Sequence, residues 1–152
     1  MERMKEIFIV LGLSMLPISE LRGAILYGIT TSIPFKTIFL ISILGNLIPV
    51  IPLYFFLERL LKFTGKYKYG KKFNDWLINR TKSKSKIIDV YKTLGLLIFV
   101  GIPLPMTGAW TGTIASVLFQ LDFKSFLIGI TCGVIMAAFI VSGLLIGIKS
   151  IF

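Results

Sequence analysis

Apolar residues gather in long runs along this chain, and charged residues are confined to the segments between them. Residues 37–57, 93–121 and 125–148 contain no charged side chain. A helix needs about 20 apolar residues to cross a hydrocarbon core roughly 30 Å thick. Each run is long enough, so the pattern predicts an all-α integral membrane protein.

Two apolar stretches are interrupted by proline. The first interruption runs from Pro17 to Ala24, and the second from Pro103 to Trp110. Proline removes a backbone donor and clashes with the preceding turn, so a helix cannot continue unchanged through these segments. In lipid the freed backbone groups must be buried in protein or line a wet cavity, where transporters bind substrate. The two breaks are therefore the first places to look for function.

The arm before the first break is too short to span a membrane. Ile7 to Leu16 extends about 15 Å, half of the hydrocarbon thickness. This length favours two re-entrant helical hairpins, at residues 7–30 and 94–120, with transmembrane helices at 35–57 and 125–150. The alternative is that each broken segment crosses fully, which gives four spans with both termini inside.

The two halves of the chain resemble each other in their order of features. Each has a short apolar arm, a proline break, the pair Gly-Ala, a second arm and a long helix, at an offset of about 86 residues. The order predicts a first membrane repeat at residues 1–57 and a second at 93–152. If the hairpins enter from opposite sides, this is an inverted repeat.

The connection between the halves, residues 58–92, is strongly basic. It holds 11 of the 17 Lys and Arg residues against three acidic residues, Glu58, Asp75 and Asp89. Loops rich in Lys and Arg stay on the cytoplasmic side, so this connection is expected there. Nucleic acid is not an expected partner of a loop tethered to a bilayer.

Part of the basic connection has the spacing of an interfacial helix. Phe73, Trp76 and Leu77 stand at i, i+3 and i+4. Lys71, Lys72 and Arg80 flank them, which suits a short helix on anionic lipid headgroups. A solvated basic loop without a partner is the alternative.

Composition narrows the chemistry. Mean hydropathy is +0.87 and 55% of the residues are apolar. There is no histidine and one cysteine, Cys132, which excludes disulfides, the usual zinc sites and histidine-based catalysis. We therefore expect that the protein is not an enzyme and that it binds no metal or cofactor.

The N-terminal run could be read as a signal peptide, because Arg3 and Lys5 precede it. No small-x-small cleavage site follows, and Glu20 and Arg22 stand where cleavage would be expected. The segment is expected to be retained.

Three motifs in this order resemble the bacterial and archaeal small multidrug export protein family, a distant relative of the DedA membrane proteins. They are Pro17 to Ile25, Gly45 to Pro49 and Ile102 to Gly112. The resemblance implies two oppositely facing re-entrant hairpins packed with long helices in an inverted repeat. For the DedA relatives it implies transport, in several cases of a polyprenyl phosphate carrier lipid, often linked to protons. Leu26 and Met106 differ from the family pattern, which tends to have proline and glycine there.

Glu20 and Arg22 are the only charged residues between Glu6 and Lys36. A charge at membrane depth costs several kcal/mol or more unless it is paired or hydrated. We hypothesise that Arg22 binds an anionic headgroup through its forked donors and that Glu20 takes up and releases a proton. The alternative is a structural ion pair that fixes the hairpin.

The second break has no charge, but it has polar groups that suit an anion. The candidate substrate-binding residues here are Thr107, Gly108, Trp110 and Thr111. Hydroxyls and backbone N–H groups at a helix N-terminus bind phosphate or carboxylate. Trp110 is expected either to contact an isoprenoid chain or to mark the membrane interface.

Other residues indicate helix packing. Asn46 lies halfway along a predicted helix, and Pro49 and Pro52 would free carbonyls for its amide, so it is expected to join helices. Two G-x-x-x-G pairs, Gly129 with Gly133 and Gly143 with Gly147, predict a close contact with the hairpin of the other half or with a second protomer. A homodimer is expected.

Three functional classes follow. The first is a multi-pass secondary transporter in a prokaryotic cell membrane that moves an amphiphilic anion such as a lipid phosphate. The second is an exporter of small cationic drugs, in which Glu20 would bind the cation. The third is a structural membrane protein without transport.

Overall fold

The computed structural model describes residues 2–64, 93–104 and 107–151, together with 72, 75, 76 and 79. The predicted interfacial helix around Phe73 and Leu77 lies largely outside these residues. The described part is helical, which confirms the all-α prediction for it. Its helices are α1 (Glu2–Met15), α2 (Glu20–Gly28), α3 (Phe35–Thr64), α6 (Thr93–Gly101), α7 (Ala109–Leu118) and α8 (Phe123–Ile151).

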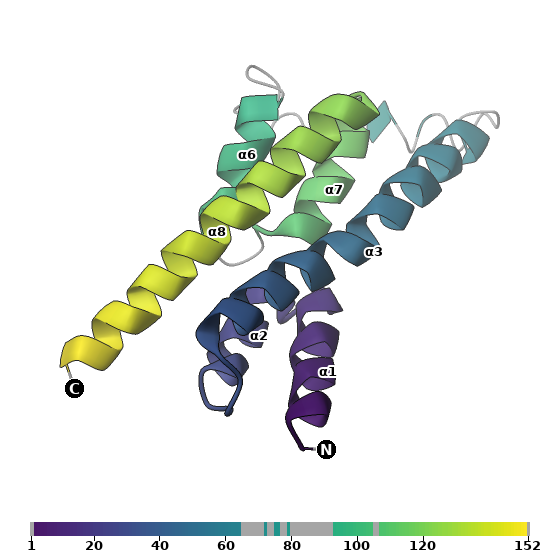
Figure 1. Cartoon of the computed structure of the whole chain (residues 1–152). Helices are drawn as coiled ribbons and strands as arrows, with labels where there is room; N and C mark the ends of the chain where they lie inside the picture. The colour runs from purple at the N-terminus through teal and green to yellow at the C-terminus, as the bar shows by residue number, and fades with distance from the viewer. Residues whose placement is uncertain are drawn as a thin grey trace.

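Two short helix pairs and two long helices make up most of the described part of the molecule (Figure 1). Helix α2 packs beside α1 and leads back to the end of the molecule where both termini lie. The pair α6 and α7 opens towards the opposite end, where α3 ends and α8 begins. The long helices α3 and α8 run obliquely past both pairs, so the bend of each pair lies in the middle of the molecule.

Helices α3 and α8 are long and apolar enough to cross a membrane. They contain 30 and 29 residues, or about 45 Å each at the rise of an α-helix. Pro49 and Pro52 lie inside α3 without ending it. None of the four short helices exceeds 14 residues, about 21 Å, so none spans 30 Å of hydrocarbon alone.

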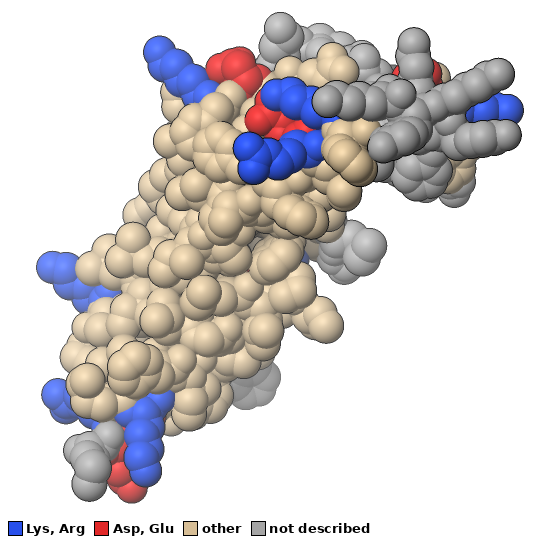
Figure 2. All heavy atoms as spheres, turned by 90° about the vertical axis from the view of Figure 1, so that its right-hand side faces the viewer, with Lys and Arg blue, Asp and Glu red and all other residues tan. Residues whose placement is uncertain are grey.

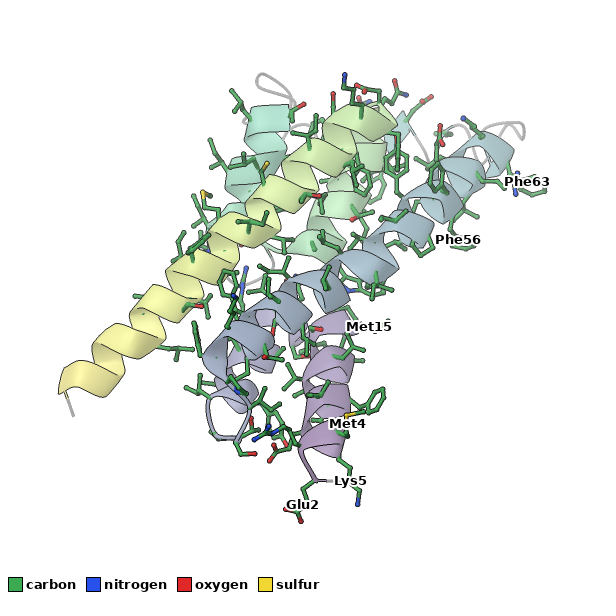
Figure 3. All side chains as sticks on the ribbon, viewed as in Figure 1. Glu2, Met4, Lys5, Met15, Phe56 and Phe63 are labelled. Atoms are coloured by element: carbon green, nitrogen blue, oxygen red, sulfur yellow. The ribbon has the colours of Figure 1, made fainter. Side chains whose placement is uncertain are left out.

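The outer surface is that of a membrane protein. Most charged side chains on the face in Figure 2 gather at its two ends, and a broad uncharged band lies between them. Met4, Phe56 and Phe63 point outwards from the bundle (Figure 3) and are 58%, 63% and 59% exposed. An apolar surface of this extent suits lipid and would aggregate in water.

Glycines allow each long helix to approach a short one. A Cβ at Gly133 would lie 2.8 Å from Val100 and 3.0 Å from the Leu97 carbonyl of α6. A Cβ at Gly45 would overlap the Ser14 hydroxyl and lie 3.1 Å from the Leu11 carbonyl of α1. The close approach is therefore built in the same way in both halves.

The prediction for Gly129 and Gly133 was wrong in its partner. Both face α6, the short helix of their own half, because α6 and α8 lie side by side in close contact and run in the same direction. A Cβ at Gly143 or Gly147 would meet nothing within 4 Å. The second pair thus lies on an open face of α8.

Aromatic packing connects α3 to the start of α8. The ring of Tyr54 stacks on Phe126 with a centroid separation of 4.3 Å. Its hydroxyl donates a hydrogen bond to the Leu121 carbonyl at 2.7 Å. This contact anchors the second half of α3 to the turn between α7 and α8.

Candidate functional site

The first elbow, residues 16–19, joins α1 to α2. The Glu20 N–H donates to the Leu16 carbonyl at 3.0 Å, and the Ser19 hydroxyl donates to the Leu13 carbonyl. Glu20 has a positive φ of 48°, an uncommon conformation for a residue with a side chain. This left-handed residue turns the chain into α2 and directs the Glu20 side chain towards the second half.

The second elbow, residues 102–108, joins α6 to α7; residues 105 and 106 lie outside the described part. The Thr107 hydroxyl accepts from the Leu104 N–H at 3.1 Å and lies 2.7 Å from the Ile102 carbonyl. The Gly108 N–H donates to the Thr111 hydroxyl at 3.0 Å. Both threonine hydroxyls are therefore engaged in local backbone contacts.

Arg22 binds the second elbow. Its Nη1 donates to the Leu104 carbonyl at 2.6 Å, and its Nη2 donates to the Thr107 carbonyl. The Thr107 hydroxyl lies a further 3.4 Å from Nη2. The forked guanidinium thus donates to carbonyls that the break leaves without helical partners. Arg22 stands 82 positions before Leu104 in the chain.

Glu20 lies at the N-terminus of α7. Its carboxylate accepts from the Trp110 N–H at 3.4 Å and from the Ala109 N–H. The residue is 8% exposed. A helix N-terminus carries a partial positive charge and free N–H groups, so it stabilises a buried carboxylate.

Two further contacts fix this arrangement. A Cβ at Gly108 would overlap the Glu20 carboxylate, so glycine leaves the room that the carboxylate occupies. The Trp110 indole N–H donates to the Met15 carbonyl at 3.2 Å, which satisfies the C-terminal end of α1. Trp110 therefore contacts the opposite elbow.

We call the residues that join the two elbows the elbow site: Glu20, Arg22, Leu104, Thr107, Gly108 and Trp110. No salt bridge directly joins Glu20 to Arg22, although Arg22 is close enough to act on Glu20 electrostatically. Each charge instead binds backbone groups of the other half. An Arg, a helix N-terminus and one carboxylate give a site in which positive potential exceeds negative whenever the carboxylate is neutral or displaced.

Most residues of the elbow site were predicted from the sequence, but the contacts between them were not. Glu20, Arg22, Thr107, Gly108 and Trp110 come together, and Thr111 lies beside them bound to Gly108. The N–H groups that were expected to bind substrate bind the Glu20 carboxylate instead. The Arg22 guanidinium donates to backbone carbonyls. The carbonyls of Leu104 and Met15 were missed; the signal for them was the proline break itself, which requires outside donors.

Asn46 and Ser42 form a buried polar pair one turn apart on α3. Both are 0% exposed, and neither the Asn46 amide nor the Ser42 hydroxyl has a hydrogen-bond partner in the described part of the chain. The role of Asn46 in joining helices thus has no hydrogen bond behind it and stays a prediction.

The described residues contain no group of three His, Cys, Asp or Glu side chains that could hold a metal ion. Cys132 is exposed on α8 and has no disulfide partner in this part of the chain. The chemistry of the elbow site is therefore that of one carboxylate, one guanidinium and oriented backbone groups.

Comparison with known proteins gives one match. A family model described as "Putative small multi-drug export protein" matches residues 20–140. No curated protein matches the chain, and no solved structure matches it. The matched span runs from Glu20 through both sides of the elbow site and most of α8, so the chain belongs to the small multi-drug export protein family.

Proposed function

We propose that the protein is a secondary transporter that moves an amphiphilic anion, such as a polyprenyl phosphate carrier lipid, across a prokaryotic cell membrane. The observation that carries the proposal is the Glu20 carboxylate bound at the N-terminus of α7. An anionic group of the chain itself occupies a place that suits a substrate phosphate. The family description, which names export, supports transport in general.

In this proposal α1 with α2 and α6 with α7 are re-entrant hairpins of an inverted repeat. The short lengths of the four helices, the opposite openings of the pairs and the matching approaches at Gly45 and Gly133 support it. With the basic connection in the cytoplasm, both termini face outside. The kinship with the DedA proteins belongs to the same proposal.

Proton coupling follows from competition at the α7 N-terminus. While Glu20 is ionised, its carboxylate binds the N–H groups of Ala109 and Trp110. Protonation removes the charge that holds the carboxylate there. A substrate phosphate can then bind the N–H groups, with Arg22 balancing its charge. Proton and anion enter together, and the elbows move apart and close again between outward and inward states.

Transport by purified protein in liposomes tests this proposal. We expect uptake of a polyprenyl phosphate driven by a proton gradient, no uptake of the uncharged polyprenol, and loss of proton dependence in Glu20→Gln. Arg22→Gln is expected to reduce anion transport. Transport of the polyprenol at the same rate, or unchanged proton dependence in Glu20→Gln, would contradict the proposal.

Export of small cationic drugs is the second candidate function. The family description favours it, and so does Glu20, the one buried carboxylate among the described residues. The α7 N-terminus and Arg22 oppose it, because both repel a cation from Glu20. A lipophilic cation in the same liposome assay decides between them: transport of the cation and not of the phosphate would establish this function instead.

A structural role without transport is the third reading. In it, the elbow site only joins the halves, and the liposome assay finds no flux of either ion. Homodimer formation and binding of anionic headgroups by the basic connection are expectations in all three readings.

A further inference from the structure

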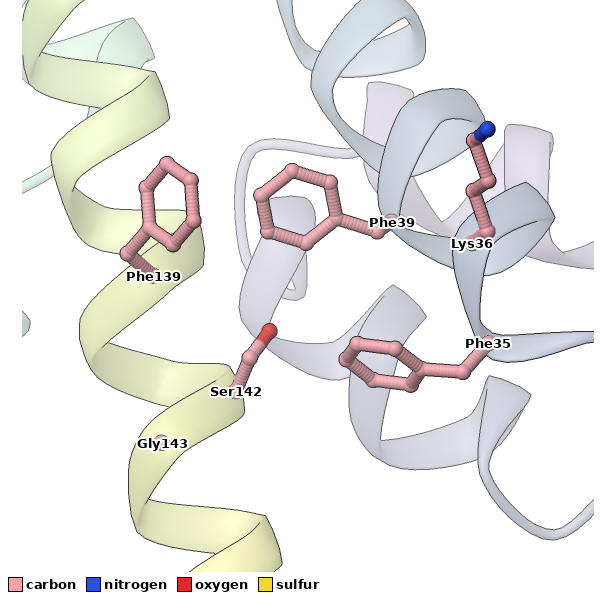
Figure 4. A pocket seen from close by; sticks show the side chains of 6 residues that line it. All are labelled: Phe35, Lys36, Phe39, Phe139, Ser142 and Gly143. Atoms are coloured by element: carbon pink, nitrogen blue, oxygen red, sulfur yellow. The ribbon is translucent and has the colours of Figure 1, made fainter.

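A groove lies between the first turns of α3 and the C-terminal half of α8 (Figure 4). Its volume is about 420 Å³. It is lined by Phe35, Lys36, Phe39, Phe139, Ser142 and Gly143. None of these residues belongs to the elbow site.

Three phenylalanine rings form the walls of the groove. Phe39 packs directly against Phe139, with ring centroids 5.1 Å apart, and its centroid lies 6.3 Å from that of Phe35. Phe139 is 64% exposed, so the groove opens outwards. Such walls suit a hydrocarbon chain.

Ser142 places a polar group in these apolar surroundings. It is 6% exposed, and its hydroxyl has no hydrogen-bond partner in the described part of the chain. A serine in a helix commonly donates to a carbonyl of the preceding turn, but this one is directed into the space between the rings (Figure 4). A buried hydroxyl without a partner is unfavourable, so it favours an occupant that offers an acceptor.

Lys36 provides a positive charge at the rim. It is exposed in the first turn of α3, at the end of the molecule where both termini lie, and has no ion-pair or hydrogen-bond partner among the described residues. Lys36 directly follows the first residue of a candidate membrane span, Phe35–Phe63. A lysine at that depth attracts anionic headgroups.

We propose that the groove binds a membrane lipid with an anionic headgroup. One acyl chain lies along the rings of Phe35, Phe39 and Phe139, an ester oxygen accepts from the Ser142 hydroxyl, and the headgroup lies near Lys36. The volume falls in the range of ligand pockets, about 300 to 1,000 Å³. A helix of a second copy, about 10 Å across, is too wide to enter it.

Lipid binding can be separated from dimer formation by two glycine substitutions on α8. Gly143→Leu places a side chain in the groove, and its Cβ meets nothing within 4 Å. Gly147→Leu is the matched control, since its Cβ is equally unobstructed but lies outside the groove. Both substitutions would disturb a second copy packed on this face.

The measurement is native mass spectrometry of the full chain with phosphatidylglycerol and phosphatidylcholine. We expect wild type to retain phosphatidylglycerol preferentially, Gly143→Leu to bind it roughly tenfold more weakly, and Gly147→Leu to match wild type. Equal binding by Gly143→Leu would overturn the proposal. So would loss of a dimer in both variants with no change in lipid bound per chain, which would assign the face to a second copy.

Two side-chain variants test the polar contacts. Lys36→Gln is expected to weaken the binding of phosphatidylglycerol about fivefold, the factor typical of one lysine at an anionic surface. It should leave the binding of phosphatidylcholine unchanged. Ser142→Ala is expected to weaken both lipids roughly threefold. An unchanged preference in Lys36→Gln would remove the headgroup assignment. None of the substituted residues belongs to the elbow site, so this result does not depend on the transport proposal.

Discussion

At the scale of single residues, the two charges that follow the first elbow are stabilised by backbone groups of the other half rather than by each other. Arg22 donates to carbonyls of the second elbow, and Glu20 accepts from the first N–H groups of α7. A proline break leaves carbonyls and N–H groups unpaired, and in lipid each unpaired group is costly. The charges therefore stabilise the breaks as much as the breaks stabilise the charges.

Substitution of Arg22 tests the carbonyl contacts. Arg22→Gln leaves the Leu104 and Thr107 carbonyls without their charged donor, and we expect it to lower stability by about 2 kcal/mol. Arg22→Lys keeps the charge but cannot bind both carbonyls in a fork, so we expect an intermediate loss. Thermal unfolding in detergent measures both. Equal melting temperatures for Arg22→Lys and wild type would mean that charge alone matters.

Gly108 tests the position of the Glu20 carboxylate. The added methyl of Gly108→Ala overlaps that carboxylate, and we expect a loss of about 1 to 2 kcal/mol as it shifts away from α7. The backbone at Gly108 is extended, so alanine itself causes no strain there. In a Glu20→Ala background the same substitution should cost almost nothing.

The control for this double-mutant cycle of Gly108→Ala and Glu20→Ala is Gly12→Ala on α1, where a Cβ meets nothing within 4 Å. It should be neutral or slightly stabilising in either background, because alanine favours a helix. Additive effects of Gly108→Ala and Glu20→Ala would show that the two residues do not interact.

The sequence indicates which residues form the site but not how they pair. Proline breaks and isolated charges are visible in the chain, and they identify Glu20 and Arg22 directly. The pairing of Arg22 with Leu104 and Thr107 depends on how two hairpins meet, across 82 positions or more. Backbone carbonyls carry no residue-type signal, so the proline break indicates that donors are needed but not which residues supply them.

At the scale of helices, the observed ends differ from the predicted ends for local reasons. Helix α3 continues to Thr64, beyond the predicted end at 57, because Glu58, Arg59 and Lys62 are good helix formers. Lys62 also pairs with Glu58 at 2.6 Å. Charge marks where a helix leaves lipid, and it does not mark where the helix ends.

Asp122 sets the start of α8. Its Oδ2 accepts from the Ser125 N–H at 3.1 Å, three residues later, as an N-cap does. We expect Asp122→Ala to lower the melting temperature and Asp122→Asn, which can still accept this bond, to change it little.

The pH dependence of this cap has a definite sign. Hydrogen bonds from Ser125, first from its side chain and then from its backbone, lower the pKa of Asp122 below its usual value of 3.8. The stabilisation is therefore full at neutral pH and is lost only as pH falls through the lowered pKa. Thermal melts between pH 7 and 3 should give a constant difference between wild type and Asp122→Ala above about pH 5 and a shrinking difference below it. A difference that disappears near pH 6 would contradict the assignment.

At the scale of the whole molecule, the hairpin proposal predicts on which side of the membrane each segment lies. Single cysteines at Arg3 and Lys62, in a Cys132→Ser background, should be labelled from opposite sides, Arg3→Cys from outside. Two full crossings before Lys62 would put both on the cytoplasmic side. Labelling of intact cells with an impermeant maleimide distinguishes the two arrangements.

The contacts between the elbows also bear on how the protein is made. When a ribosome has completed α3, it has already synthesised Glu20 and Arg22. The groups that bind them lie 82 to 90 residues further along the chain. Until α7 is synthesised, both charges lack their final partners, and a charge in hydrocarbon is expelled or hydrated. We therefore expect the first half to wait at a wet or protected edge of the insertion machinery, with membrane integration completed only when the second half arrives.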